Sequence, residues 1–559
     1  MKSRISFCDT TVLKKNLVRF APAWVLYGVL WLLILIIMLD SDGTGAYFAN
    51  TMADSLQATG DINMIYAFLC AQLLFGDLYN SRMCNALHAM PLRRETWFFT
   101  HVISGLAFSF LPNFLIMLLS ATFMGSSFVV APLWLLINTL QFLFFFGIAV
   151  FSVYSVGNRF AMALVYMIIN FFSMIAYWLV ESLYAPQLYG IVIDETPFTW
   201  FCPVFFMMSE PVLDAIFPYS AIATISIEPD TGFWYLLICT AVGIAFYALA
   251  LLLYRRRNLE CAGDFVAARA FAPVFLILYC LCGGAVGYMF FSLFVGEENL
   301  FFLLVGIVIG WFTGRMLLER TVRVFRLKSF IGCGILLLAF FGSLLLTQLD
   351  PLGITRWVPK ADAVSGVHLH AGGSRYDYYK NGNNYFEDSQ AIESVLAMHR
   401  YGIQNRSADT NGKADVELTI DYVLRSGATV SRKYVLDIDT PESEALEEIM
   451  SRSQIVLGTE YTDAKRIAET LVLIEAPSGK HIYGEDLVPL LEAVLKDCAE
   501  GNMAQGYAFH NNEIATWLTL QLKTDGNYHE YRDLQVYADC RHTLQYLLDN
   551  NYLRESDYK

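Results

Sequence analysis

Long apolar runs separated by short polar segments dominate the first 349 residues of the chain. A helix that crosses a bilayer needs about 20 mostly apolar residues. Nine runs approach or meet this length, and they predict spans at residues 22–39, 63–78, 99–123, 131–153, 160–183, 233–253, 273–293, 300–316 and 330–348. The pattern therefore predicts a polytopic α-helical membrane protein with about nine transmembrane helices.

Basic residues in this region fall in alternate segments between the predicted spans. Of the 18 Lys and Arg residues before position 350, the first, third, fifth, seventh and ninth segments hold five, three, one, four and four, and the remaining one, Arg315, lies at the end of the eighth span beside the ninth segment. Cytoplasmic loops carry such an excess of positive charge. We therefore expect a cytoplasmic N-terminus, an external C-terminal region after an odd number of crossings, and a location in the plasma membrane. No small-residue cleavage site follows the first run, so we expect it to be a retained anchor.

The composition becomes polar from Trp357 onward and predicts an extracytoplasmic α+β domain. Residues 416–424 alternate between apolar and polar, Ser426 and Gly427 supply a turn, and a second strand continues to Ile438. Thr440 and Pro441 predict the start of a helix that ends near Met450. Further helices are expected at 389–401, 486–499 and 540–550, and further strands near 364–370, 469–475, 515–523 and 533–537.

Charge and cysteine usage exclude several classes of function. Residues 350–559 hold 20 basic and 33 acidic residues, a net charge of −13, which makes nucleic acid an improbable partner. The outward-facing cysteines are Cys202, Cys498 and Cys540. The last two could pair, although we expect two buried free thiols. No Cys/His spacing typical of a metal site occurs, so we predict no metal ligands.

Two segments outside the predicted spans leave alternatives open. Residues 9–20 combine apolar residues at helical spacing with Lys14, Lys15 and Arg19. This pattern fits an amphipathic helix beside anionic lipid, or a basic flank that needs no helix. Residues 198–217 are apolar but interrupted by proline, and they predict either a hairpin that dips into the membrane or a pair of additional spans.

Two motifs resemble those of ABC-2 type ABC transporter permeases. The stretch Asn85-Ala-Leu-His-Ala-Met-Pro-Leu-Arg-Arg-Glu-Thr-Trp97 is similar to that family's Leu-Pro turn before the third span, and Tyr254–Gly263 is similar to the Arg-rich segment of a Firmicute subgroup of drug and peptide exporters. The resemblance covers about residues 1–270. It implies an interfacial helix at 1–21 and a six-helix permease core at 22–270. Three additional helices at 271–349 and the domain at 350–559 depart from the family.

The resemblance also implies a cytoplasmic ABC ATPase that docks near one short stretch, which contains Met90, Pro91, Leu92, Arg93, Arg94 and Glu95. Pro91 would begin a short helix there. The chain has no Gly-rich phosphate-binding loop, so ATP and Mg would belong to that separate subunit, and this chain would hold no cofactor of its own. Membrane lipids and a second permease copy or relative are the other expected partners.

Polar residues inside predicted spans are candidates for a translocation path, because their burial in lipid is costly. Asn113, Asn138 and Asn170 are the selected candidates, with Gln72, His101, Gln141 and Glu181 considered beside them. Such amides also bridge helices. We expect Arg315 and Glu319 to form a local ion pair. His368 and His370 share a strand face but lack a third metal ligand nearby in the sequence.

The leading hypothesis from the sequence is the membrane subunit of an ATP-driven exporter for an amphipathic or lipid-soluble substrate, such as a drug, an antimicrobial peptide or a lipid. The alternative is a membrane-anchored envelope sensor whose external domain binds a ligand. A membrane-embedded enzyme comes third, because the sequence predicts no catalytic residues.

Overall fold

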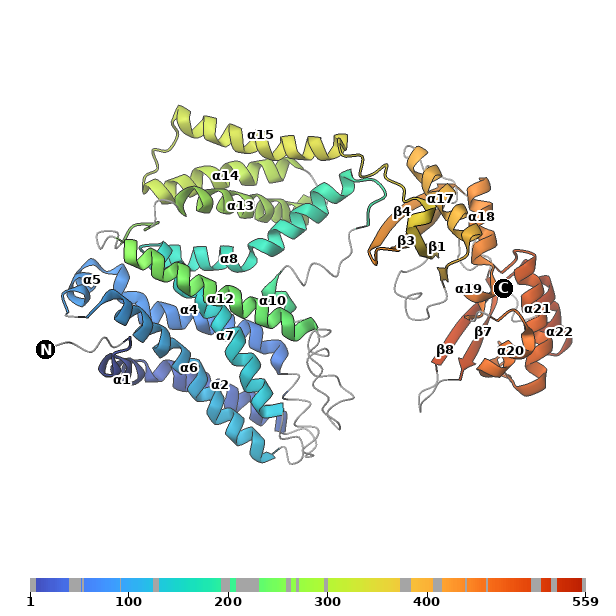
Figure 1. Ribbon diagram of the computed structural model, residues 1–559, viewed down its shortest axis with the longest axis horizontal. Coiled ribbons are helices and arrows are strands. Elements are labelled where there is room, and N and C mark those ends of the chain that lie inside the picture. The colour runs from blue at the N-terminus through green and yellow to red at the C-terminus, as the bar shows by residue number, and fades with distance from the viewer. Residues whose placement is uncertain are drawn as a thin grey trace. The chain divides into compact units, whose positions relative to one another are not determined.

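The computed structural model describes most of the chain. The described residues are 7–39, 52, 55–90, 92–123, 130–192, 202–207, 231–257, 263–267, 271–295, 300–371, 384–405, 415–437, 440–458, 461–503, 514–523 and 530–554. They form two compact units (Figure 1). The membrane unit comprises Met1–Ser182 and Asp194–Ser343, and the tail unit comprises Leu183–Ile193 and Leu344–Lys559.

The described residues of the membrane unit are mostly helical, with short non-helical connections and one isolated β-bridge between Val156 and Val266. Its helices are α1 (Thr10–Arg19), α2 (Ala21–Leu39), α4 (Leu56–Phe75), α5 (Ser81–His88), α6 (Arg94–Phe123), α7 (Val130–Ser155), α8 (Arg159–Leu179), α10 (Pro203–Phe206), α12 (Thr231–Arg256), α13 (Ala272–Val295), α14 (Leu300–Glu319) and α15 (Leu327–Leu349). Eight are long and apolar enough to cross a membrane, and the bent pair of α1 and α2 supplies a ninth if it is counted as one span. The arrangement is that of a multi-pass helical protein, with helices at the predicted places.

Helix α1 confirms that the basic segment before the first span is helical. It meets α2 at an angle of 60°. Two hydrogen bonds fasten it to α6: the Asp9 backbone N–H donates to Thr100 Oγ1 at 3.0 Å, and Asn16 Nδ2 donates to Ser104 Oγ at 3.0 Å. The exposed face of α1 carries Lys14 among its residues. An unstructured basic flank is therefore excluded.

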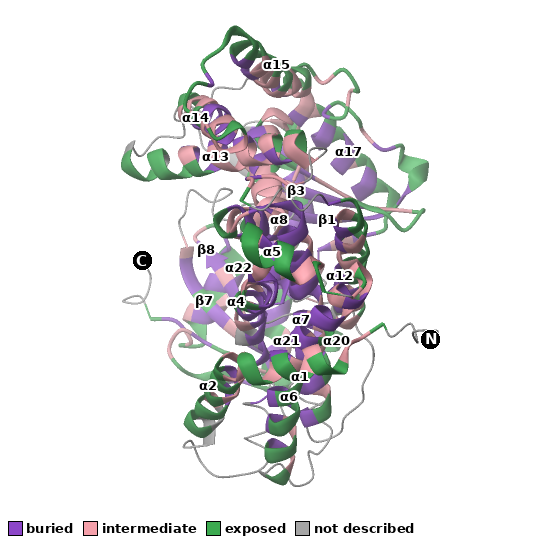
Figure 2. Cartoon of the chain, turned by 90° about the vertical axis from the view of Figure 1, so that its left-hand side faces the viewer, coloured by how far each residue is buried: buried purple, intermediate pink, exposed green. Residues whose placement is uncertain are grey.

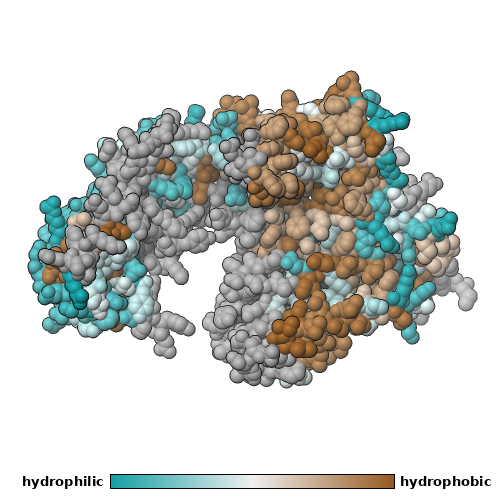
Figure 3. Space-filling view, turned by 180° about the vertical axis from the view of Figure 1, so that it is seen from behind, coloured by the Kyte–Doolittle hydropathy of each residue, from teal (hydrophilic) through white to brown (hydrophobic). Residues whose placement is uncertain are grey.

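Helix α7 forms the centre of the membrane unit, and 72% of its most apolar stretch is buried (Figure 2). It packs against α4, α6, α8 and α12. A Cβ atom on Gly147 would lie 2.4 Å from the carbonyl oxygen of Gly243, so only glycine permits this approach of α7 to α12. Hydrophobic side chains gather over the outside of the spanning helices (Figure 3). Such an apolar exterior is what contact with lipid requires.

The three helices beyond the six-helix region pack in a different way. Helices α13 and α14 approach closely through glycines, since a Cβ atom on Gly306 would lie 2.7 Å from the carbonyl oxygen of Gly283. Helix α15 is the most exposed span, with 11% of its apolar stretch buried. The predicted ion pair is confirmed, with Arg315 Nη2 2.6 Å from Glu319 Oε1.

The tail unit contains two antiparallel four-stranded sheets with helices on one face of each. The first repeat consists of β1 (Val364–Ala371), β2 (Tyr385–Phe386), α17 (Ser389–Gln404), β3 (Asp415–Leu424), β4 (Thr429–Asp437) and α18 (Pro441–Met450). After the short helix α19 (Ser453–Val456) and α20 (Ala464–Thr470), the second repeat consists of β5 (Leu471–Glu475), β6 (His481–Ile482), α21 (Leu487–Ala499), β7 (Ile514–Leu522), β8 (Glu530–Tyr537) and α22 (Arg541–Asp549). Each repeat has its own apolar core between sheet and helices.

The two repeats share one topology. Their strand orders are β2-β1-β3-β4 and β6-β5-β7-β8, so corresponding strands occupy corresponding places. The hairpin registers also correspond: Ile420 pairs with Arg432 in the first, and Leu520 pairs with Arg532, both numbered 100 higher, in the second. The tail is therefore a tandem arrangement of one β-β-α-β-β-α fold.

An extended segment after α8 joins the first sheet at its outer edge. The Lys433 backbone N–H donates to the carbonyl oxygen of Gly190 at 3.0 Å, and Ile191 forms an antiparallel bridge with Arg432. Gly190 has φ +78° and lies where a Cβ atom would meet the Tyr434 ring at 2.4 Å. The segment is held at an edge that strand β4 otherwise leaves open.

Several expectations from the sequence are confirmed, and one needs correction. The predicted hairpin is present, with its second strand described to Asp437, as is the Thr440 cap, and Cys498 and Cys540 are free thiols. The helix predicted to begin at Pro91 is absent from the described residues that follow it, because Leu92 and Arg93 are not helical and the short helix α5 ends earlier, at His88. Arg94 instead starts α6 itself, because the spanning helix extends five residues before its apolar run. Residues 198–201 and 208–217 of the predicted dipping hairpin lie outside the described residues.

His399 makes the first repeat sensitive to acid. Its ring is fully buried on α17, with Nδ1 3.0 Å from the Tyr422 hydroxyl. Burial, together with the positive charges of Arg432 and Arg400, lowers the pKa of His399 to about 4. Unfolding returns the imidazole to water, where its pKa is about 6.5.

We predict that His399 removes stability as the pH falls. As the pH falls, the imidazole becomes protonated in the unfolded state before it does in the folded state. The free energy of unfolding is therefore unaffected by His399 above about pH 6.5 and decreases by about 3 kcal/mol between about pH 6.5 and 4. Thermal unfolding of the tail in the full-length protein should show this slope, and His399→Leu should flatten it. An identical slope in the variant would contradict the assignment.

Candidate functional site

The ends of three helices meet in a polar cluster that we call the hub. It contains His88 on α5, Arg94 and Glu95 on α6, and Tyr254, Arg255 and Arg257 at the end of α12. Arg94 Nη1 donates to the carbonyl oxygens of Tyr254, Arg255 and Arg257 at 3.2, 3.4 and 3.1 Å. Glu95 Oε1 lies 3.2 Å from Arg255 Nε. His88 Nε2 lies 3.0 Å from the Tyr254 hydroxyl.

The hub follows from the chemistry of helix ends. The last carbonyl groups of a helix have no partner within it, and they carry partial negative charge. The guanidinium of Arg94 satisfies several of them at once. Because Arg94 is on the first turn of α6, the start of one spanning helix is fixed to the end of another.

A second arginine extends the hub to α7. Arg257 is 7% exposed, and its Nη1 donates to the carbonyl oxygen of Val153 at 3.1 Å. The turn after α7 is held by residues 263–267, since Gly263 N–H donates to the carbonyl oxygen of Gly157 at 2.6 Å. Helices α6, α7 and α12 are thus joined at one end.

A cavity of about 20 Å³, about the size of one water molecule, lies beside His88 and Tyr254 of the hub and is lined by both apolar and polar residues. Polar side chains from five elements line it, among them Asp77, His88, Trp97, His101 and Tyr254.

In the stretch expected to contact an ATPase, some side chains take part in the hub and others are exposed. Arg94 and Glu95 take part in the hub, as described above. Met90 is 43% exposed and Arg93 is also exposed. The Leu92 backbone N–H donates to the carbonyl oxygen of Met90 at 2.7 Å, which makes a tight turn. Pro91 lies outside the described residues.

Buried amides link four spanning helices within the membrane unit, in what we call the amide network. Asn63 on α4 is at its centre. Its Nδ2 donates to Asn138 Oδ1 at 2.9 Å and to Gln141 Oε1 at 3.1 Å, both on α7. Its Oδ1 accepts from the Tyr27 hydroxyl of α2 at 3.2 Å, and that hydroxyl accepts from Asn113 Nδ2 of α6 at 3.2 Å. All five side chains are buried.

Two of the three candidate path residues are therefore linked through the amide network, and the third is not. Asn113 and Asn138 belong to the amide network, whereas Asn170 Nδ2 donates to the carbonyl oxygen of Tyr166 on its own helix. Asn113 Oδ1 and Asn138 Nδ2 have no hydrogen-bond partner among the described residues. An unused acceptor and an unused donor could bind polar groups of a substrate, at the cost of burial without a partner.

Sequence reasoning missed Asn63 and Tyr27. Asn63 stands at the first position of a predicted span, and Tyr27 was counted as apolar. Other polar candidates have structural partners: Gln72 Nε2 donates to the carbonyl oxygen of Arg159 at 3.1 Å, and His101 Nδ1 lies 2.9 Å from that of Trp97. Glu181 lies in a π-helical turn, Val180–Tyr184, after α8.

The tail histidines share a face but pair locally. His370 Nε2 lies 3.7 Å from Asp421 Oδ2, and both side chains are buried. His368 Nδ1 lies 3.4 Å from Asn384 Oδ1. These contacts give both histidines protein partners.

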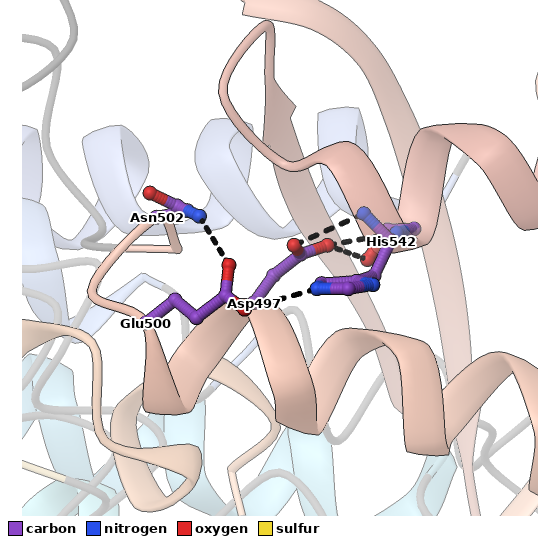
Figure 4. Close-up of polar contacts among 5 residues, drawn as sticks. Asp497, Glu500, Asn502 and His542 are labelled. Carbon is purple, nitrogen blue, oxygen red and sulfur yellow. Dashed lines mark hydrogen bonds and ion pairs between the residues drawn. The ribbon is translucent and has the colours of Figure 1, made fainter.

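One cluster in the second repeat has the composition of a metal site. Asp497, Glu500 and His542 bring three ligand atoms within 4.8 Å of one another (Figure 4). The buried Asp497 carboxylate accepts hydrogen bonds from the His542 N–H at 3.1 Å, the Thr543 N–H at 2.7 Å and the Thr543 hydroxyl at 2.6 Å. It caps the start of α22, where the helix dipole is positive and repels a cation. We therefore assign the cluster a structural role.

Comparison with known proteins yields no relative: no protein-family model, curated protein or solved structure matches this chain.

We predict that Arg94→Ala destabilises the membrane unit by about 2 kcal/mol, because the partly buried carbonyl groups at the end of α12 lose a charged donor. Arg93→Ala, which removes the same charge from the neighbouring exposed position, should leave stability unchanged. Thermal unfolding in detergent distinguishes them, and equal stability of both variants would contradict the hub.

Asp497→Asn should lower the free energy of unfolding of the tail by about 1–2 kcal/mol. The variant replaces the carboxylate, a charged acceptor of three hydrogen bonds, with a neutral amide. Millimolar Zn²⁺ or Mn²⁺ should leave the melting temperature of the unaltered protein unchanged. A metal-dependent increase that Asp497→Asn abolishes would show that the cluster binds metal.

Proposed function

We propose that this chain is the membrane subunit of an ATP-driven exporter similar to ABC-2 permeases. A separate cytoplasmic ATPase would dock around Met90–Arg93, and the substrate would be an amphipathic or lipid-soluble molecule such as a drug, a peptide or a lipid. The observation that carries the proposal is the hub, in which the two sequence motifs that resemble the family contact each other through Arg94 and the end of α12.

The hub offers a route for mechanical coupling. Displacement of the exposed Met90–Arg93 turn would move Arg94, and with it the end of α12. Arg257 would pass the displacement to Val153 on α7. Asn138 lies 15 residues earlier on α7, about 22 Å along the axis, so a rigid helix links the docking turn to the amide network.

The amide network is the proposed polar element of the path. Hydrogen bonds between amides can exchange partners, which permits discrete rearrangements of α2, α4, α6 and α7. The unused groups of Asn113 and Asn138 would bind polar atoms of the substrate, while the apolar interior accommodates the rest.

One contact supports the proposed external position of the tail. Gly190 and Ile191 pair with β4, so the segment after α8 and the segment after α15 must lie on the same side of the membrane. An even number of crossings must therefore separate them. Helices α12, α13, α14 and α15 provide four, in agreement with the charge pattern.

The test is purification of the tagged protein from its native membranes in mild detergent, followed by identification of bound proteins. We predict a stoichiometric ATPase with nucleotide turnover. Arg93→Ala should reduce its recovery about fivefold, as expected for an interface charge worth about 1 kcal/mol.

Arg323→Ala is the matched control, because Arg323 is another exposed residue of a predicted cytoplasmic segment and should leave recovery unchanged. Absence of any ATPase from intact preparations would contradict the proposal and favour the envelope-sensor alternative, in which the segment at Gly190 would connect the tail to α8.

A further inference from the structure

The two tail repeats provide an internal comparison for their outward sheet faces. Leu418, Ile420 and Tyr434 face the helices in the first repeat, and Leu518, Leu520 and Leu534 do so in the second. Residues between them point away from the helices. Because fold and register match, a difference between the outward faces is not required by the fold.

Two acidic residues on the outward face of the first repeat have partners on neighbouring strands. Glu417 forms an ion pair with Lys433 on the neighbouring strand. Asp421 is buried beside His370. Both of these acidic side chains therefore have a partner on a neighbouring strand.

The outward face of the second repeat, which we call the aromatic face, is different. Its positions on β5, β7 and β8 hold two acidic residues and no Lys or Arg: Leu473, Glu475, Trp517, Thr519, Gln521, Tyr531, Asp533 and Gln535. Trp517 and Tyr531 are 44% and 62% exposed. The corresponding positions of the first repeat hold Glu417 and Ser431, so the fold does not require aromatic residues there.

The register gives the aromatic face a defined geometry. Tyr531 pairs with Gln521, four residues along β7 from Trp517, so the two rings lie about 14 Å apart. Thr519 lies midway and is flanked by Glu475 on one side and Asp533 on the other. Thr519 Oγ1 donates to Asp533 Oδ1 at 2.7 Å. His481 on β6 is the cross-strand neighbour of Glu475, and neither carboxylate forms an ion pair with a described Lys or Arg.

We propose that the aromatic face binds an extended cationic peptide. Alternate side chains of an extended chain point the same way and repeat at about 7 Å. Three alternating basic residues would place the outer two over Trp517 and Tyr531, as cation–π contacts, and the middle one between Glu475 and Asp533. The tail's net charge of −13 attracts such a ligand over longer range. The inference is independent of the transport proposal.

The experiment uses the full-length protein in phosphatidylcholine nanodiscs, since neutral lipid does not attract the peptide. The probe is a fluorescent heptapeptide with the sequence Gly-Arg-Ser-Arg-Ser-Arg-Gly, and its isomer Gly-Ser-Ser-Arg-Arg-Arg-Gly has the same charge with different spacing. Trp517→Ala and Tyr531→Ala should each weaken binding about fivefold, which corresponds to one exposed cation–π contact. Asp533→Asn should also weaken it, and the isomer should bind less tightly.

The matched control is the first repeat, where Glu417→Gln removes one acidic residue and Ser431→Ala alters the position equivalent to Tyr531. Neither should change the affinity. Equal weakening by Glu417→Gln and Asp533→Asn would show attraction to the whole acidic tail and overturn the proposal. Binding of cellohexaose to the same face, without peptide binding, would reassign it to glycans. Unchanged melting temperatures of the variants ensure that a loss of binding is local.

Discussion

A polar group inside hydrocarbon must find its partner within the protein, and this constraint organises the membrane unit. Asn63 meets it by joining α4 to α2 and α7, and Asn113 extends the connection to α6. At the opposite end of α7, the groups that need partners are the backbone carbonyl groups at the ends of helices. Arg94 and Arg257 supply donors there to carbonyl groups that the helices leave unsatisfied. Both sets of contacts converge on α7, the most buried spanning helix.

Much of the architecture was predictable because it follows from short-range patterns. Apolar runs place the spanning helices, and the alternation around Leu418 places the β3–β4 hairpin. The Thr440 cap was predictable because its donor, the Ser443 N–H, lies three residues away. Asn113 and Asn138 were identified as path candidates because their residue type is costly in lipid.

The remaining features depend on contacts between residues far apart in the chain. Arg94 lies 160 residues from Tyr254, so its charge predicted a cytoplasmic location but not the end of α12 as its partner. The two tail repeats share few residues at matched positions, and their common topology becomes evident from strand order and register. The isolated β-bridge at Ile191 involves too few residues to produce an alternation of apolar and polar residues in the sequence. Asp497, which caps α22 from another helix, has no local signature.

The proposed function requires the hub to face the cytoplasm and the tail to lie outside, so the most direct measurement is labelling of single introduced cysteines with a membrane-impermeant maleimide. In intact cells, in a background without accessible native cysteines, cysteines at Tyr483 in the tail and at Arg93 beside the hub should behave oppositely. The account predicts labelling at position 483 without permeabilisation, and labelling at position 93 only after it. Labelling of position 93 from outside would place the hub away from ATP and contradict the account.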